Sequence, residues 1–296
     1  MAPKIEPIAK MVIAAADSGN VIFPLSIIHL DETVRRREQK SRQRLAEFMV
    51  RVSKGWAILP ASRIIEAEVE DACLKQLGFK GYDLQSWAVR KGLSHMLGAK
   101  LQLVARKPLH PDLERKLLVA ADSPEALLLA MKQGFGDTVA SMLRRAAAAE
   151  KLEQIRLLES QIKDNRMRHK ATIAQYLLSQ IGPRLFTFLS SMNIDPNVIL
   201  QSAFTNEEHI IRFFRSMPTS YCNAELVFRR DMLKERKIAP NDLHDIMSLS
   251  IGIPYSDVVV TEKMWHSIIV QAKLDRLRPT RILGSVQQLP SVLPSG

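Results

Sequence analysis

A stretch near the C-terminal end, residues 240–275, constrains the fold of this chain more than any other. Asn241 follows a proline and favours a helix start, because an Asn side chain can accept from the free N–H groups of a first helical turn. We expect this helix to end at Gly252, two residues before another proline. Val258–Val260 then predicts a short strand covered on both faces, and a second helix follows around Trp265.

Three acidic residues fall at particular places in this pattern. Asp242 and Asp245 are three positions apart, so they share a face of the first predicted helix. Glu262 comes directly after the predicted strand, and ligands of open α/β sheets collect outside the carboxyl ends of strands. A cluster of three carboxylates is costly unless a cation neutralises it, and oxygen ligands suit Mg²⁺ or Mn²⁺. The alternative is that the two aspartates only complement the dipole of their helix.

At these residues the sequence resembles the PIN-domain (PilT N-terminal) superfamily of metal-dependent nucleases. The family has an acidic residue that opens a helix, then an apolar strand, then Thr or Ser with another acid close behind. Asp245, Thr261 and Glu262 match this order. The family often has the second acid two residues after the Thr, whereas here it follows at once. The sequence pattern Asn-Asp-x-x-Asp, followed by Pro-Tyr-x-Asp-Val-Val-Val-Thr-Glu, resembles that of a bacterial PIN-like branch.

The resemblance also implies a ligand near the N-terminus. PIN domains place an acidic metal ligand on the helix after their second strand, and Glu32 matches that position in the segment from Pro24 to Thr33. The alternative is a solvated Glu flanked by arginines. His29 lies one turn before Glu32, and we expect it to be a hydrogen-bonded helix residue rather than a ligand, since hard cations prefer oxygen. The resemblance therefore implies Asp245, Glu262, Glu32 and Asp242 as ligands of Mg²⁺ or Mn²⁺, with Thr261, Asn241 and His29 in support.

A basic segment begins directly after Glu32. Residues 34–54 carry eight basic and two acidic side chains, and we expect them to form one helical segment. A nuclease must hold the phosphates of its substrate against their own charge, so such a face suits nucleic-acid binding. The alternative is a solvated face without a ligand. The predicted phosphate-binding residues are Arg35, Arg36, Lys40 and Arg44.

The overall composition points the same way. The chain has a net charge of +11, which favours an anionic partner and most simply a nucleic acid. Apolar runs stay below the ~18 residues that a membrane span needs, so we expect no membrane partner. The two cysteines, Cys73 and Cys222, stand too far apart for a metal motif, and a reducing cytoplasm is the expected location.

The middle of the chain differs from both ends in its predicted secondary structure. Residues 61–215 are predicted to be almost wholly helical, and residues 137–181 contain no Gly or Pro, which favours a bent helix or a helical hairpin. The expected fold class is α/β and predominantly helical, with a small parallel sheet of PIN-like type interrupted by an all-helical insertion. The expected parts are 1–60 and 216–282 for the PIN-like domain, 61–215 for the insertion, and 283–296 for a disordered tail.

The resemblance leaves one ligand unassigned. PIN domains open with an apolar strand that ends in an Asp, whereas this sequence starts almost directly with a helix at residues 5–17. Either a strand precedes Met1 in the complete protein, or the site lacks this part and its activity is low. Two functions stay open. One is a metal-dependent endonuclease that acts on RNA or other single-stranded nucleic acid. The other is a non-catalytic nucleic-acid-binding or adaptor protein, with a protein partner or self-association through the insertion.

Overall fold

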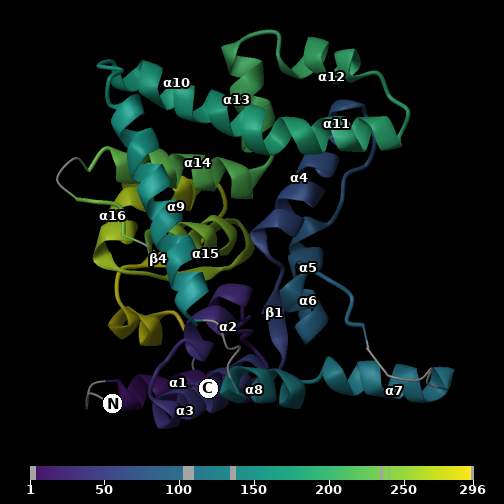
Figure 1. The fold of residues 1–296 in the computed structure, drawn as a ribbon, viewed down its shortest axis with the longest axis vertical. Coiled ribbons are helices and arrows are strands. Elements are labelled where there is room, and N and C mark those ends of the chain that lie inside the picture. The colour runs from purple at the N-terminus through teal and green to yellow at the C-terminus, as the bar shows by residue number, and fades with distance from the viewer. Residues whose placement is uncertain (1–4, 103–109, 134–137, 234–235, 240, 295–296) are drawn as a thin grey trace. The chain divides into compact units, whose positions relative to one another are not determined.

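The computed structural model describes residues 5–102, 110–133, 138–233, 236–239 and 241–294, and for residues 138–146 and 148 it describes the backbone alone. Helices dominate this part of the chain, which confirms the predicted predominance of helix in an α/β chain (Figure 1). Its strands form two sheets of two strands each. The chain divides into two compact units, and both units contain segments that are far apart in the sequence.

The first unit consists of Met1–Pro60, Gln85–Val139 and Ser285–Gly296. Its elements are α1 (Glu6–Ser18), α2 (Ile27–Val34), α3 (Gln39–Ser53), β1 (Trp56–Ile58), α5 (Leu84–Ala88), β2 (Val89–Lys91), α6 (Leu93–Leu97), α7 (Pro111–Ala121), α8 (Pro124–Gln133) and the 3-10 helix η3 (Val286–Ser291). Helix α3 packs against both α1 and α8. The core between these elements contains the fully buried side chains of Ala46, Met96 and Met131.

Strand pairing in the first unit begins after Pro24. Strands β1 and β2 are antiparallel, with Trp56 opposite Lys91. The apolar run at residues 21–23 is not a strand. Instead Leu25 makes a single parallel bridge to Ala57, beyond Pro24, which has no N–H group to donate. The run is therefore an extended entry to α2.

The second unit consists of Ala61–Leu84 and Ala140–Gly284. Its elements are α4 (Ala61–Gln76), most of α9 (Thr138–Glu159), α10 (Asn165–Tyr176), the π-helix η1 (Leu177–Ile181), α11 (Gly182–Ser191), α12 (Pro196–Ala203), α13 (Glu207–Arg215), α14 (Pro218–Asp231), α15 (Asp242–Tyr255), β3 (Val258–Val260), α16 (Lys263–Gln271), the 3-10 helix η2 (Leu274–Arg276) and β4 (Arg281–Leu283). Helices α14 and α15 lie side by side (Figure 1).

Strands β3 and β4 form the parallel pair of this unit, with Val258 opposite Arg281 and Val260 opposite Leu283. Helix α15 leads into this pair and runs through Gly252 to Tyr255, so the expected stop at Gly252 is wrong. A proline is tolerated here because it costs one N–H bond in the last turn. The hydroxyl of Thr280 also donates to the carbonyl of Ile253 at 2.7 Å, which anchors the end of the helix.

Three further expectations differ from the structure. The basic segment is not one helix, because α2 ends at Val34 and α3 begins at Gln39. Of the two forms expected for residues 137–181, the described part has separate helices, α9 and α10, rather than one bent helix, and the polar loop between them ends at Asp164, whose carboxylate caps α10. The described part of the predicted disordered tail contains η3, because Leu289 provides an apolar side chain that is only 8% exposed. The two units also cross the expected boundaries of the insertion at residues 61 and 215.

Candidate functional site

Asp242 is buried at the start of α15, with 1% of the residue exposed. One carboxylate oxygen accepts from Nη2 of Arg236 at 2.7 Å, and the other accepts from the backbone N–H of Ala239 at 3.0 Å. Asn241 occupies the N-cap position, but its side chain makes no capping hydrogen bond, contrary to expectation. Asp242 therefore stabilises the turn that enters α15, and a counter-charge already neutralises it.

Asp245 lies one turn further along α15 and is joined to the next helix. Its Oδ2 accepts from the indole Nε1 of Trp265 at 3.1 Å, and Trp265 is a buried residue of α16. Glu262 is the N-cap residue of α16, three positions before Trp265, and it is exposed. Residues three apart share a helix face. The second unit therefore brings the elements that carry Asp245 and Glu262 together.

Thr261 lies at the end of β3, as predicted, and its backbone N–H donates to the carbonyl of Leu283 at 2.9 Å. This bond extends the parallel pair by one residue. It also fixes the backbone next to Glu262 at the carboxyl end of the strand, the position that the sequence predicted for it.

Glu32 and His29 lie on α2 in the first unit, whereas the other predicted ligands lie in the second. Ser26 and His29 form a capping box, in which Nδ1 of His29 accepts from the backbone N–H of Ser26 at 3.0 Å. Burial lowers the pKa of His29, and the nearby Glu32 charge opposes this only in part. The ring is neutral at pH 7 and caps its own helix, which confirms it as a hydrogen-bonded helix residue. Glu32 itself is exposed.

These contacts determine how well the predicted ligands fit a metal ion. Within the described residues, no group of three or more His, Cys, Asp or Glu side chains is arranged to hold a metal. Both oxygens of Asp242 are occupied by Arg236 and Ala239, so Asp242 does not fit the role of a ligand. Asp245 and Glu262 carry the hard oxygen donors that Mg²⁺ and Mn²⁺ prefer.

The basic residues divide into two kinds. Arg35 forms an ion pair with Asp31 one turn earlier on α2, so its charge is compensated. Arg36 follows in the loop and is exposed, with one hydrogen bond to the hydroxyl of Ser41 at 3.2 Å. Lys40 and Arg44 are exposed on α3, four positions apart on one helix face. Neither Lys40 nor Arg44 has an acidic partner in the part of the chain that the structure describes.

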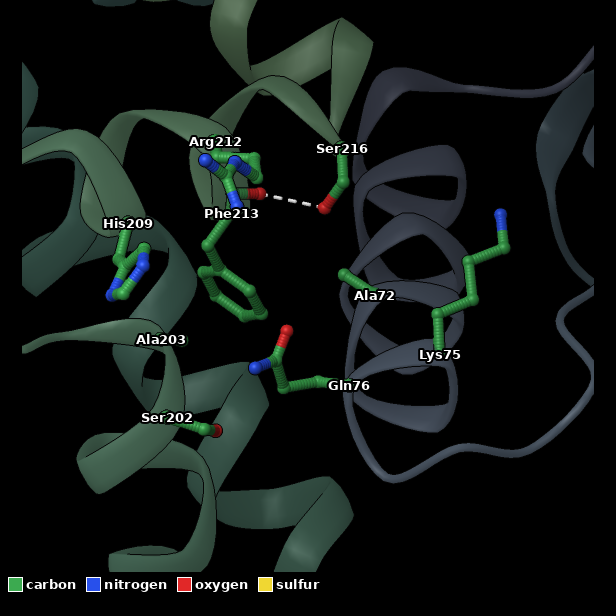
Figure 2. A pocket seen from close by; sticks show the side chains of 9 residues that line it. All are labelled: Ala72, Lys75, Gln76, Ser202, Ala203, His209, Arg212, Phe213 and Ser216. Atoms are coloured by element: carbon green, nitrogen blue, oxygen red, sulfur yellow. Dashed lines mark hydrogen bonds between the residues drawn. The ribbon is translucent and has the colours of Figure 1, made fainter.

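A cavity of about 230 Å³ lies in the second unit between α4, α12 and α13. The ring of Phe213 and the amide of Gln76 point into it, between His209 on one side and Ala72 on the other (Figure 2). The sequence does not predict this cavity. Its residues come from three helices that are distant in the sequence, and no short motif joins them.

A buried carboxylate was missed as well. Glu68 of α4 accepts from the backbone N–H of Thr219 at 2.9 Å and from the hydroxyl of Tyr255 at 2.8 Å. It therefore links the start of α14 to the end of α15. In the sequence, Glu68 is only an acidic residue between Ala67 and Val69 in an amphipathic stretch. That pattern does not indicate its partners Thr219 and Tyr255.

Comparisons with known proteins give no relative. No family model matches the chain, and neither a characterised protein nor a solved structure matches it. No helix among the described residues has both the length and the apolar character that crossing a bilayer requires.

Proposed function

We propose that this protein binds RNA through exposed basic side chains at the start of α3. Lys40 and Arg44 carry the proposal, because they lie on one face of α3 and have no acidic partner among the described residues. Arg36 adds a third exposed cation in the preceding loop. Such side chains can replace the cations that are condensed along the phosphates of a nucleic-acid strand, and the release of these counterions provides much of the affinity.

The charge of the whole chain supports this choice. A net charge of +11 attracts a polyanion over distances of about a Debye length. We extend the proposal to a reducing cytoplasm, because Cys73 and Cys222 are buried free thiols. Free thiols persist where glutathione and thioredoxin keep cysteines reduced.

The proposal is tested by fluorescence anisotropy with a single-stranded RNA oligonucleotide at fixed salt. The double substitution Lys40→Gln and Arg44→Gln should weaken binding about tenfold, because it removes two phosphate contacts. The matched control is Arg115→Gln with Lys116→Gln, which removes the same charge from exposed positions on α7 of the same unit. An equal loss in both variants would show that only net charge matters, and would refute the assignment to α3.

A second candidate is metal-dependent cleavage of the bound strand at Asp245 and Glu262. The hydrogen bond from Trp265 to Asp245 favours it, because it joins the helix that carries one acid to the helix that the other acid caps. The two carboxylates would hold Mg²⁺ or Mn²⁺. A bound divalent ion supplies an activated water and neutralises charge on the phosphate. Glu32 stays a proposed ligand from the resemblance alone, and we omit Asp242 because Arg236 and Ala239 occupy it.

Cleavage is tested by incubating a labelled RNA with Mn²⁺ or with EDTA. Asp245→Asn and Glu262→Gln should each abolish any Mn²⁺-dependent cleavage while the far-ultraviolet circular dichroism stays unchanged. Asp257→Asn is the matched control, because Asp257 is an exposed acid at the opposite end of β3. Wild-type cleavage by both site variants would exclude these acids, whereas RNA binding without any cleavage would leave only the binding function.

A further inference from the structure

The cavity between α4, α12 and α13 has the size of a small ligand. Its volume of about 230 Å³ is below the range of roughly 300–1,000 Å³ that holds drug-sized ligands and large cofactors. Three helices of one unit form its walls, so the cavity is a property of that unit alone. A nucleobase would fit it, with any group attached to the base lying at the rim.

The apolar lining of the cavity comes from all three helices, and one amide lies among it. Ala72, Ala203 and Phe213 form the apolar surface, and all three are buried residues. The amide of Gln76 points across this surface toward the ring of Phe213 (Figure 2). A primary amide offers two donors and one acceptor in a plane, which is the pattern that reads the edge of a nucleobase. The combination suits a flat heterocycle better than a purely apolar ligand.

Two side chains of α13 bring nitrogen groups to the cavity. Nδ1 of His209 is buried and has no hydrogen-bond partner among the described residues. A buried polar atom without a partner costs about 1–3 kcal/mol, which a ligand or a water at this point would recover. Arg212 lies one turn further on α13, and its ion pair with Glu208 is exposed on both sides. Such exposed pairs contribute little, so Arg212 can turn to an anion at the rim.

The remaining polar side chains bring no negative charge to the cavity. Lys75 contributes its stem, while its ammonium is held by the buried carboxylate of Asp71 at 2.6 Å and points away from the cavity (Figure 2). None of the described residues that line the cavity is acidic. The cavity therefore combines an apolar lining with the imidazole of His209 and the guanidinium of Arg212.

We propose that this cavity binds one nucleotide, with its base against Phe213 and Gln76 and its phosphate at Arg212. This binding site lies in the second unit and goes beyond the basic face of α3. The nucleotide is either a free ribonucleotide or one nucleotide of a single-stranded RNA. Because single-stranded RNA is read by stacking on aromatic rings and by contacts to base edges, both sources present the same chemistry to the cavity.

The test is isothermal titration of the full chain with AMP, CMP, GMP and UMP, and with adenosine and inorganic phosphate as partial ligands. At least one nucleotide should bind at least about tenfold more tightly than either partial ligand, because the base and the phosphate contribute separately. Equal affinity of inorganic phosphate and all four nucleotides, or no binding at all, would overturn the proposal.

Substitutions locate the site. Gln76→Ala and Arg212→Gln alter exposed side chains, and each should weaken nucleotide binding about tenfold, the effect of losing a hydrogen bond to a charged or specific partner. Arg63→Gln is the matched control, since it removes a cation from an exposed position of α4 that does not line the cavity. Unchanged affinity in both cavity variants would overturn the assignment.

Two further comparisons separate this site from the basic face. A trinucleotide that binds more tightly than the best mononucleotide identifies RNA as the source, and the reverse order identifies the free nucleotide. The variant Lys40→Gln with Arg44→Gln should bind the mononucleotide like the wild type. Loss of long-RNA binding with intact nucleotide binding then supports the cavity independently, whereas loss of mononucleotide binding in this variant would overturn it.

Discussion

Glu68 is a carboxylate in a position where none of the residue is exposed. Burial raises its pKa from 4.5 to about 7, and the hydrogen bonds from Thr219 and Tyr255 oppose that rise only in part. A carboxyl group whose pKa is higher in the folded state than in the unfolded state favours folding when it is protonated. Its contribution is therefore fully present below about pH 4.5 and is lost as the pH rises through about 7.

The substitution Glu68→Gln tests this. The amide oxygen of Gln can accept from both Thr219 and Tyr255, as Oε1 of Glu68 does. The variant should match the wild type at pH 4.5 and exceed its free energy of unfolding by up to about 3 kcal/mol at pH 8. Urea denaturation at the two pH values measures this, with Glu66→Gln as an exposed control on the same helix. A Glu68→Gln variant that is no more stable than the wild type at pH 8 would contradict the prediction.

Among the predicted site residues, the sequence indicated residue types and positions along elements, but not their partners. Glu262 does follow β3, and His29 does cap its own helix. Asp242 was expected beside a metal ion, and the structure instead pairs it with Arg236. Arg236 is six positions away, at a place where the chain turns, so no helical spacing predicts this ion pair.

At the scale of elements, α15 depends on a contact at its C-terminal end. Pro254 removes one backbone N–H from the last turn, and the hydroxyl of Thr280 donates to the carbonyl of Ile253 in a buried position. The same residue precedes β4, so it connects the end of α15 to the parallel pair. A lost donor would leave a buried carbonyl without its partner.

Thr280→Val should therefore lower the free energy of unfolding by about 1–3 kcal/mol, since the methyl groups fill the same space and only the donor is lost. Thr187→Val is the matched control, because the hydroxyl of Thr187 also donates to a backbone carbonyl, that of Pro183, but in an exposed position. Thermal denaturation of both variants measures the difference. Equal melting temperatures for the two variants would mean that the Thr280 bond does not stabilise α15.

Helices with clear capping residues and a periodic apolar face were predictable. The residues at which they begin and end depended on tertiary contacts. The sequence predicted α1 and the strand β3 at nearly their observed positions. It did not predict the break between α2 and α3, because residues 35–38 contain no Gly or Pro and their polar pattern continues that of a helix. Strand β4 was missed because a run of three residues carries little periodicity, and its pairing with β3 is not local.

At the scale of the whole molecule, the chain is organised as two discontinuous units rather than as a split domain with one insertion at 61–215. The net charge of the chain was predictable from composition, since it does not depend on which residues contact each other. The boundaries of the units were not predictable. The segment 85–139 belongs to the first unit through tertiary contacts, and no repeat or linker in the sequence marks this. The cavity of the second unit has the same origin, as three distant helices form it.

The central claim is that exposed cations at the start of α3 bind RNA phosphates. The salt dependence of RNA affinity tests it most directly, because the slope of log affinity against log salt reports how many phosphates the protein neutralises. The wild type should show a steep negative slope, and the variant Lys40→Gln with Arg44→Gln should show a slope shallower by about two. Equal slopes for the wild type and this variant would contradict the claim and return Lys40 and Arg44 to the role of solvated surface residues.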